Sequence, residues 1–438
     1  MHSNIFSNLH SLYNIKKNLS LSAVQIEDMQ LKKLQALIMH AYANVPYYHN
    51  LFNKTGIRPG DIKTRSDLLR IPITTKSHLQ NLTFNEKITK GIDKNKCLNL
   101  RTSGSTGRPL DIFITKEEVL RSKTIAFLNM YLENGCQLTD RTLRVVTPSF
   151  ITKERLWFQR LGILREYFIS IFDDINVQLN TFLQTRPHAI RGFTSGIKSL
   201  ALKVKEMEIK FKPPKVIFTT AEVLSPMDRR LISSTFQAEV VDYYCCNEVG
   251  IIAYECKEHD GYHINDDNVI IEFIREDGTL CKSGEEGNIV ITGLNRYIMP
   301  FIRYQIGDRG IIRDKPCRCG KAFHIIETII GRDNDQIMLP DGNKVSSHLL
   351  LNVIIDIPGI LAYQIIQKER DRISIQIVKD KHFSEDLIVS RIEKGCHQVL
   401  NGKIKVESSI VDEIPKEKTG KFKVIKNEVS NLRSYLLQ

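Results

Sequence analysis

The sequence predicts an α/β protein with a large N-terminal domain of parallel sheets covered by helices, a small antiparallel sheet within it, and a smaller α+β C-terminal domain. Short β-rich runs alternate with helical stretches between residues 140 and 245, which is typical of a parallel sheet with helices on its faces. From residue 251 the pattern changes to hairpins. At 438 residues the chain is too long for one ordinary hydrophobic core.

The first part of the chain is predicted to be helical. Apolar residues recur at helical spacing through residues 22–55, and the helix breaks at Val45-Pro46 because a residue before proline disfavours helical backbone. Residues 66–80 predict a capped helix, a turn and another helix start. Further helices are expected at 116–134 and 153–168.

Four β-rich runs then predict the parallel sheet: RTLRVVT, AIRGF, KVIFTT and EVVDYY. Helices at 195–207 and 226–235 separate the later runs. NVIIEFI and GNIVITGL flank the turn sequence REDG and predict an antiparallel hairpin. DQIMLPDGNKV predicts another hairpin around Asp341-Gly342, and a helix, two strands, a helix and a strand follow it.

These patterns divide the chain into two domains. Residues 1–333 form the N-terminal domain, with a helical segment at 1–95, an α/β part at 96–250 and a hairpin-rich part at 251–333. Residues 334–438 form the C-terminal α+β domain, which has a usual domain size.

Composition excludes several classes of protein. No apolar stretch reaches membrane-spanning length and the N-terminus lacks the apolar core of a signal peptide, so we expect a cytoplasmic protein without a membrane span. The net charge of +12 arises from basic residues interleaved with acidic ones. This favours solubility and attraction for small anions over nucleic-acid binding. In a reducing compartment the nine cysteines are expected to be thiols or metal ligands.

A loop rich in glycine and hydroxyls lies between two apolar runs in LNLRTSGSTGRPLDIFIT, residues 98–115. It offers three hydroxyls and two flexible glycines: Ser103, Gly104, Ser105, Thr106 and Gly107. Such a loop can wrap phosphate oxygens with hydroxyls and backbone N–H groups, although an ordinary surface hairpin has the same composition. It is not a Walker A motif, since Arg108 follows the last glycine directly.

Further motifs give the loop a context. Glu222 stands in VIFTTAEVLSP, Glu248 in VVDYYCCNEVG and Asp308 in PFIRYQIGDRG, and IIGRDND and EIPKEKTGKFKV follow. This succession resembles the adenylate-forming superfamily, and within it the phenylacetate–coenzyme A ligase family with its capsule-biosynthesis relatives. The runs HAYANVPYYHNLFNKTGIRPGDI and IPITTKSHL, and the CRCG before GRDND, share the resemblance.

The resemblance implies a two-step reaction. A carboxylic acid attacks the α-phosphate of ATP, which is bound with Mg²⁺, to give an acyl-adenylate and pyrophosphate. A thiol, usually coenzyme A, then takes the acyl group. Catalysis of this kind needs positioning and charge neutralisation more than covalent help.

The resemblance also implies roles for residues of the N-terminal domain. The loop 103–107 would hold the β- and γ-phosphates, with Thr106 and Glu248 among the catalytic residues and Glu248 holding Mg²⁺. Tyr244 would stack against adenine and Asp308 would accept from the ribose hydroxyls. The adenine side would be lined by Ala221 and Glu222. Structural alternatives stay open, such as core packing for Tyr244 and a turn for Asp308.

Two more residues are implied near the C-terminal domain. Arg332 would sit near the ribose or the phosphates at the domain junction, or else form a surface salt bridge. Lys421 would neutralise charge developing on the α-phosphate, whereas a lysine in a basic tail is ordinarily a solvated charge. In the family the small domain is mobile and swings between the half-reactions, and Asn334 occupies the hinge position.

The sequence departs from the family at the hinge, where relatives commonly carry aspartate instead of Asn334, after VVTPSF, where the aromatic-glycine pattern of aryl-acid ligases is missing, and in the motif before Glu248. Relatives carry glycine and a hydroxyl where this chain has Cys245 and Asn247, so phenylacetate itself is not the expected acid. Arg303 could pair with a substrate carboxylate or brace Asp308. Cys246 could be a reactive thiol, but no partner base is evident.

Cysteines and histidines gather in YECKEHDGYHI and KPCRCGKAFH. Four soft or borderline ligands from two hairpins can close a tetrahedral structural zinc site. We select Cys256, His263, Cys317 and Cys319, since relatives with the CxCG turn tend to carry the histidine at the second position. Unmetallated thiols are the alternative, because paired CxxC motifs would be a stronger signal.

Three functions remain open. The first is an AMP-forming acid–thiol ligase that transfers the acyl group to coenzyme A. The second passes it to an amine, a carrier-protein pantetheine or a sugar in polysaccharide or natural-product biosynthesis. The third is a non-catalytic nucleotide-binding protein, which would have no need of Lys421. The identity of the acid stays open, and the family allows a homodimer.

Overall fold

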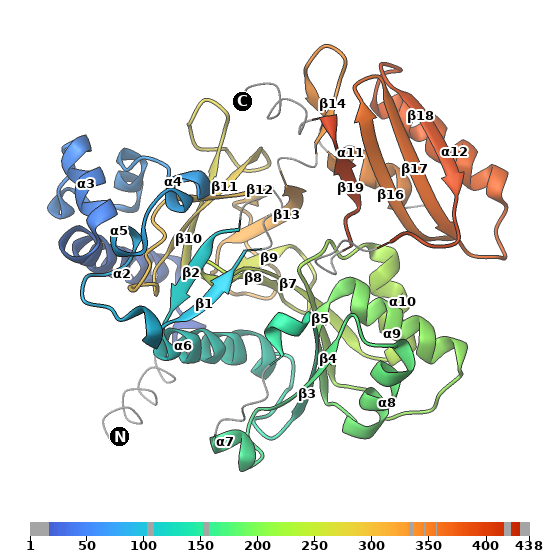
Figure 1. Ribbon diagram of the computed structural model, residues 1–438, viewed down its shortest axis with the longest axis horizontal. Coiled ribbons are helices and arrows are strands. Elements are labelled where there is room, and N and C mark those ends of the chain that lie inside the picture. Colours follow the sequence, from blue (N-terminus) through green and yellow to red (C-terminus); the bar gives the residue numbers. More distant parts are fainter. Residues whose placement is uncertain are drawn as a thin grey trace. The chain divides into compact units, whose positions relative to one another are not determined.

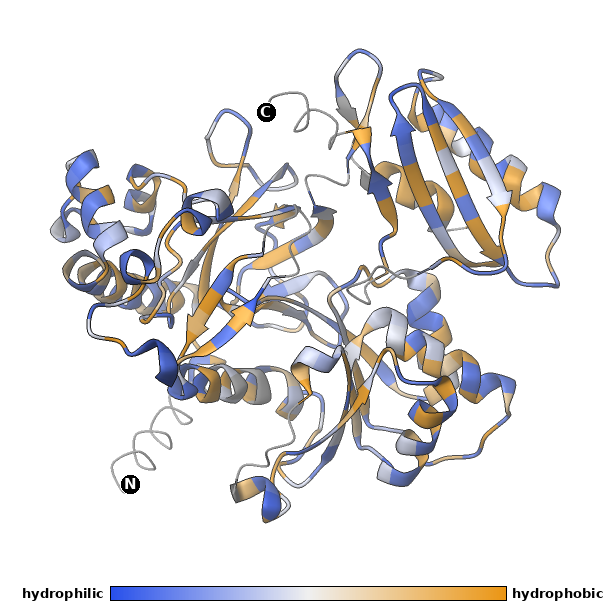
Figure 2. Ribbon diagram, viewed as in Figure 1, coloured by the Kyte–Doolittle hydropathy of each residue, from blue (hydrophilic) through white to orange (hydrophobic). Residues whose placement is uncertain are grey.

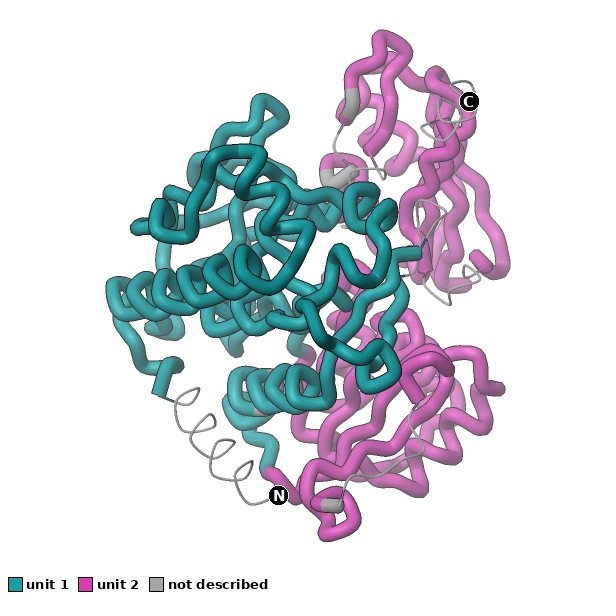
Figure 3. Tube along the Cα trace, turned by 60° about the vertical axis from the view of Figure 1, so that its left-hand side comes forward, with its two compact units in different colours: residues 1–137, 241–329 teal, residues 138–240, 330–438 magenta. Residues whose placement is uncertain are grey.

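The computed structural model (Figure 1) describes residues 17–102, 109–151, 157–332, 336–345, 347–355, 357–415 and 422–429. It has two compact units (Figure 3). The first comprises residues 1–137 and 241–329, and the second comprises residues 138–240 and 330–438. The domain boundary expected at residue 333 therefore stays a prediction.

The first unit begins with two helices, α2 (Ala23–Asn44) and α3 (Pro46–Thr55). Ser22 caps α2, because its hydroxyl accepts a hydrogen bond from the backbone N–H of Gln25. Val45 has extended backbone (φ −114°) ahead of the proline, so the predicted break is confirmed. The apolar faces of both helices are buried in one core: Leu34, Leu37, Ile38, Ala41, Tyr48 and Phe52.

The other helices of the first unit are α4 (Lys76–Gln80), α5 (Phe84–Lys87), α6 (Lys116–Ala126) and a π-helical turn at Phe127–Leu132. Its strands are β1 (Leu98–Arg101), β2 (Asp111–Ile114), β7 (Glu239–Cys246), β8 (Gly250–Glu255), β9 (Tyr262–Ile264), β10 (Val269–Ile274), β11 (Glu286–Gly293), β12 (Tyr304–Arg313) and β13 (Ile325–Arg332), with β7 and β13 crossing the unit's borders. Short 3₁₀ turns lie at Pro59–Asp61, Arg65–Arg70 and Lys94–Lys96.

The main sheet of the first unit has the strand order β10-β11-β12-β13-β9-β8-β7. β10 and β11 pair antiparallel over their whole length, as do β8 and β9, which confirms the hairpins predicted beyond residue 251. β1 and β2 form a separate antiparallel hairpin, with Arg101 opposite Asp111. The glycine- and hydroxyl-rich loop therefore connects two paired strands.

The second unit opens with strands β3 (Arg141–Val146), β4 (Arg165–Ser170), β5 (Ala189–Phe193) and β6 (Val216–Thr220), and with helices α7 (Trp157–Arg160), α8 (Ile175–Thr185), α9 (Thr194–Glu206) and α10 (Pro226–Phe236). The four strands are parallel, in the order β6-β5-β3-β4. Helix α9 packs against β3, β5 and β6 and lies between α8 and α10 (Figure 1). The alternation of strands and helices thus gives the predicted α/β class.

The predicted helix at 153–168 is wrong in its second half. Helix α7 ends at Arg160, and the chain turns at Gly162 (φ +88°) before strand β4. β4 pairs in parallel with β3 along its whole length. The stretch REYFIS is rich in aromatic and β-branched residues, so pairing with a distant strand outweighs weak helical spacing.

The C-terminal part of the second unit is a four-stranded sheet with two helices. Its elements are β14 (Ile337–Met338), β15 (Lys344–Val345), α11 (Ser347–Ile355), β16 (Ile360–Glu369), β17 (Arg372–Lys379), α12 (Glu385–Val399), β18 (Lys405–Ile410) and β19 (Ile425–Asn427). The strand order is β18-β17-β16-β19, and β14 pairs with β15 in the predicted hairpin. Ile373, Ile375 and Ile377 are fully buried and alternate with polar residues (Figure 2), so one face of this sheet packs into its own core.

No helix among the described residues is long and apolar enough to cross a lipid bilayer.

We predict that Gly192→Ala destabilises the second unit by about 1–3 kcal/mol or more, because a Cβ at this position in β5 has no room. It would lie 2.0 Å from the backbone oxygen of Val145 in the neighbouring strand. The midpoint of urea unfolding measures the loss. Gly60→Ala is the matched control, since its Cβ would meet nothing within 4 Å. Equal midpoints for the two variants would contradict the packing argument.

Candidate functional site

The glycine- and hydroxyl-rich loop is framed by the β1–β2 hairpin. Residues 103–108 lie outside the described residues, so the assignments of Ser103, Gly104, Ser105, Thr106 and Gly107 stay predictions. At the base of the loop, the backbone N–H of Leu110 donates to the Thr102 hydroxyl (2.9 Å). Asn247 donates to the backbone oxygen of Arg101 (3.0 Å). The hairpin therefore ends beside the turn that contains Glu248.

Tyr244 and Asp308 meet directly. They lie in β7 and β12, and the Tyr244 hydroxyl donates to Asp308 Oδ2 at 2.6 Å. Both side chains are only half-buried. A charge-assisted hydrogen bond of this length fixes the orientation of both groups. The structure thus brings together the residues that the resemblance assigns to the adenine and to the ribose.

Glu248 is a buried carboxylate in the turn between β7 and β8, with 7% of its surface exposed. The Tyr304 hydroxyl donates to Glu248 Oε1 (3.2 Å), and Arg296 Nε donates to the Glu248 backbone oxygen (3.1 Å). Both donors hold the residue predicted to bind Mg²⁺. Neither was singled out from the sequence for this role, although Tyr304 lies in the PFIRYQIGD motif.

Cys246, two residues before Glu248, does not have the properties of a reactive thiol. Desolvation, and then the charge of Glu248, raises the pKa of the Cys246 thiol well above its usual range. The thiolate, which is the nucleophilic form, is therefore scarce at neutral pH.

Arg303 serves as a structural brace. It is 4% exposed and pairs with Glu272 through Nε (3.0 Å). Its Nη1 also donates to the backbone oxygens of Leu69 (3.1 Å) and Ile71 (2.5 Å). Burial raises the pKa of the Glu272 carboxyl, and the Arg303 charge opposes that effect. The alternative in which Arg303 binds a substrate carboxylate therefore loses its basis.

Glu222 and its neighbours lie in the second unit. The Glu222 carboxylate accepts from the N–H of Ser195 (2.6 Å), from the Ser195 hydroxyl (3.0 Å) and from the N–H of Phe422 (2.6 Å). It therefore satisfies a first-turn donor of α9 and anchors the C-terminal tail. Ala221 has a left-handed backbone (φ +70°). Residues other than glycine adopt this conformation at a cost in free energy.

Arg332 and Lys421 are the two remaining predicted residues. Arg332 ends β13 in the second unit. Lys421, like the hinge residue Asn334, lies outside the described residues. Phe422, which follows Lys421 in sequence, is the residue anchored by Glu222. The roles of Ala221, Glu222, Arg332 and Lys421 stay predictions.

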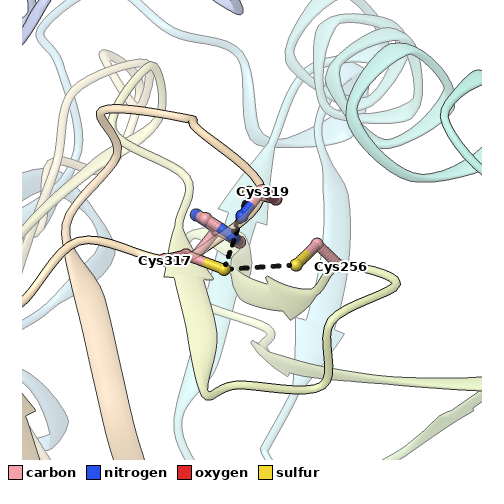
Figure 4. A group of neighbouring side chains, drawn as sticks. Cys256, Cys317 and Cys319 are labelled. Atoms are coloured by element: carbon pink, nitrogen blue, oxygen red, sulfur yellow. Dashed lines mark hydrogen bonds between the residues drawn. The ribbon is translucent and has the colours of Figure 1, made fainter.

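A second cluster contains the four residues selected as zinc ligands. One ligand atom from each of Cys256, His263, Cys317 and Cys319 lies within 4.8 Å of the others. Cys256 Sγ is 3.6 Å from Cys317 Sγ (Figure 4). Cys319 Sγ is 3.3 Å from His263 Nε2. These separations are far longer than a disulfide bond and suit sulfur and nitrogen ligands around one ion.

Local geometry explains why the four residues converge. β8 and β9 pair with Tyr254 opposite His263, so Cys256, two residues beyond Tyr254, projects to the same face. The turn after Cys317 closes through Gly320, whose φ of +82° favours glycine. Each hairpin or turn thus supplies two ligands.

Protonation in the cluster is set by burial. His263 is fully buried, and burial lowers its pKa to about 4, so the imidazole is neutral and able to ligate a metal. Burial raises the pKa of Cys256 to about 12. Burial likewise raises the pKa of Cys319, and a bound cation would compensate the charge of the thiolate forms.

The other two histidines of these stretches are engaged elsewhere. His259 Nδ1 is 3.2 Å from Glu255, and His324 Nδ1 is 3.0 Å from Asp266. His324 Nε2 also faces Arg65 Nη1 at 3.2 Å. The geometry therefore separates them from the cysteine cluster.

Comparison with known proteins gives these sites a context. Residues 337–428 match the family described as CapK C-terminal domain. The chain is 23% identical to the phenylacetate-coenzyme A ligase of Thermus thermophilus over 375 residues, covering 78% of each chain. It is 26% identical to the Escherichia coli phenylacetate-coenzyme A ligase over 350 residues, covering 75% of this chain and 76% of that protein.

Two solved structures resemble most of the chain. A 2-hydroxyisobutyryl-CoA ligase in complex with R3-HIB-AMP has a TM-score of 0.78 at 18% identity, covering 96% of this chain and 94% of that one. An anthranilate CoA ligase in complex with anthranoyl-AMP has a TM-score of 0.58 at 15% identity, covering 79% and 69%. At these identities the likeness shows the fold, which is that of adenylate-forming ligases.

We predict that Arg303→Met lowers the stability of the first unit by about 3–5 kcal/mol, because it leaves a buried carboxylate without its partner. Arg303→Met combined with Glu272→Leu should recover part of that loss, and urea unfolding measures both. Arg275→Met is the control. The side chains of the Arg275–Glu285 pair are 33% and 40% exposed, so this ion pair should contribute little to stability. A stable single variant would show that Arg303 is not a brace.

Proposed function

Because the chain belongs to the phenylacetate–coenzyme A ligase family of adenylate-forming enzymes, we propose that it activates a carboxylic acid with ATP and transfers the acyl group to coenzyme A. The observation that supports this best is the contact of Tyr244 with Asp308, in the same unit as the buried carboxylate of Glu248. We further propose that the enzyme is cytoplasmic.

In the first half-reaction the protein acts by positioning and charge. Asp308 accepts from the ribose hydroxyls, and its contact with Tyr244 keeps both groups in one orientation for the nucleotide. Glu248 would hold Mg²⁺, which when bound neutralises phosphate charge. Tyr304 and Arg296 keep Glu248 in place. Ser103, Ser105 and Thr106 bind the phosphates, and Lys421 stabilises charge developing on the α-phosphate.

The second half-reaction has two candidate acceptors. Coenzyme A is the first, in line with the ligases to which the chain is similar. The alternative acceptor is an amine, a sugar or a carrier-protein pantetheine, which follows from the resemblance of the motifs to capsule-biosynthesis relatives; residues 337–428 match the CapK C-terminal domain. Both require the same acyl-adenylate, so the adenylation step tests the proposal for either acceptor.

We also propose that Cys256, His263, Cys317 and Cys319 hold a structural Zn²⁺. Four protein ligands leave no open position for water or substrate, so the ion would stabilise the fold rather than react. It would join the β8–β9 hairpin to the turn at Cys317.

The adenylation proposal predicts acid-dependent exchange of labelled pyrophosphate into ATP. Lys421→Ala should lower the exchange rate by about 100-fold, because it removes a cation from the developing charge. Lys418→Ala, three residues earlier in the same basic run, should leave it unchanged. A panel of aromatic, hydroxy and dicarboxylic acids, each with and without coenzyme A, identifies acid and acceptor. Absence of exchange with every acid would refute the proposed function.

The zinc proposal predicts about one equivalent of zinc per chain in gently purified protein. Cys317→Ser should lose the metal and lower the melting temperature, whereas Cys97→Ser, a half-buried cysteine outside the cluster, should do neither. Elemental analysis by mass spectrometry measures the metal. Less than about half an equivalent in the unaltered protein would rule the site out.

A further inference from the structure

Arg296 is a buried arginine in the segment between β11 and β12, with only 6% of its surface exposed. Among the described residues, the one hydrogen bond of its side chain runs from Nε to the backbone oxygen of Glu248 (3.1 Å). Within the described part of the chain it forms no ion pair, in contrast to Arg303 with its partner Glu272. The four N–H groups on its two terminal nitrogens have no protein acceptor among the described residues.

A buried guanidinium without an anion is costly. Removing such a charge from water costs several kcal/mol unless an opposite charge compensates it. Glu118 is the strongest acidic influence on Arg296, but it acts only through space. Its Oε1 is occupied by the backbone N–H groups of Tyr297 (2.9 Å) and Ile298 (3.2 Å). Glu118 therefore supports the segment that carries Arg296 and does not pair with its charge.

The terminal nitrogens of Arg296 can still be reached. They are not among the fully enclosed polar atoms that lack a partner. Next to them the chain has Gly250, with φ of +83°. A Cβ there would come within 2.7 Å of the Ser122 hydroxyl and 3.8 Å of Arg296 Nη2. Glycine thus keeps side-chain atoms out of the space beside a serine hydroxyl and an unpaired guanidinium.

We propose that Arg296, with the Ser122 hydroxyl, binds an oxyanion of a reactant. The guanidinium offers paired N–H donors that match a carboxylate or a phosphate. Such an anion has two sources if the proposed function holds, on which this assignment rests: the pyrophosphate part of ATP, or a second carboxylate on the acid substrate. Either anion is consistent with the position of Arg296, which donates to the backbone of Glu248, the proposed Mg²⁺ ligand two residues before Gly250.

Binding of two probes tests the assignment without turnover. Inorganic pyrophosphate with Mg²⁺, and succinate, are titrated calorimetrically into the unaltered protein, Arg296→Gln and Arg296→Lys. Loss of a charged hydrogen bond should weaken one probe by roughly 10–100-fold in Arg296→Gln. Arg296→Lys should be intermediate, since it keeps the charge and loses the planar fork. Arg275→Gln, at an exposed pair, should bind both probes normally.

The pattern of losses decides the source. Weakened pyrophosphate binding with unchanged succinate identifies the phosphates, and the reverse identifies a dicarboxylic acid. In the second case the KM for succinate in pyrophosphate exchange should rise while that for butyrate and for ATP does not. Unchanged binding of both probes to folded Arg296→Gln overturns the assignment. If that variant does not fold, Arg296→Lys decides by the same comparison.

The experiments distinguish a failure of the anion site from a failure of the proposed function. If the unaltered protein binds a probe through Arg296 but shows no pyrophosphate exchange, the anion site stands and the adenylation proposal fails. If exchange is normal and neither binding nor any KM depends on Arg296, the anion site alone fails.

Discussion

The buried ion pair between Arg303 and Glu272 fixes the start of β12, and the candidate nucleotide residues of the first unit depend on that strand. Arg303 has a left-handed backbone (φ +45°), which costs about 1–2 kcal/mol for such a residue. Its side chain holds that conformation through Glu272 and two backbone carbonyls. The next residue, Tyr304, reaches Glu248, and Asp308 further along the strand reaches Tyr244.

Two arginines seven positions apart show how burial distinguishes structural from functional charge. Arg303 and Arg296 are both at least nine-tenths buried, yet Arg303 has a carboxylate and two carbonyls while Arg296 has one carbonyl. A buried charge whose hydrogen bonds are all made within the protein has a structural role. A buried charge without such partners indicates that a ligand supplies them.

The sulfur cluster and the Glu222 carboxylate both join segments that are far apart in sequence. Each gathers buried polar atoms from segments far apart in sequence: residues 256–263 with 317–319, and residues 195 and 222 with 422. A hairpin register or a helix terminus presents the groups, and convergence depends on the packing of the whole unit. Side chains placed in this way restrict how the joined segments can move.

The sequence by itself determined the features that short-range periodicity and turn chemistry encode. These include the helix break at Val45, the hairpins beyond residue 251 and the α/β class. The two cysteine-rich stretches indicated the sulfur cluster, and the resemblance to relatives selected His263 as its fourth member. The resemblance of the motifs to the adenylate-forming superfamily marked Tyr244, Glu248 and Asp308 as candidates. Helical spacing misread 165–168 as helix, because that strand is stabilised by pairing with a partner over twenty residues away.

Only the tertiary structure decided which partner each side chain has. It assigned Arg303 to Glu272, left Arg296 without an anionic partner among the residues that the structure describes, and set the Glu222 carboxylate against the amide of Phe422. The physical reason is that hydrogen bonds and ion pairs between distant segments depend on distance and desolvation in the folded chain. Local sequence patterns specify neither the distance between two such groups nor how far each is removed from water.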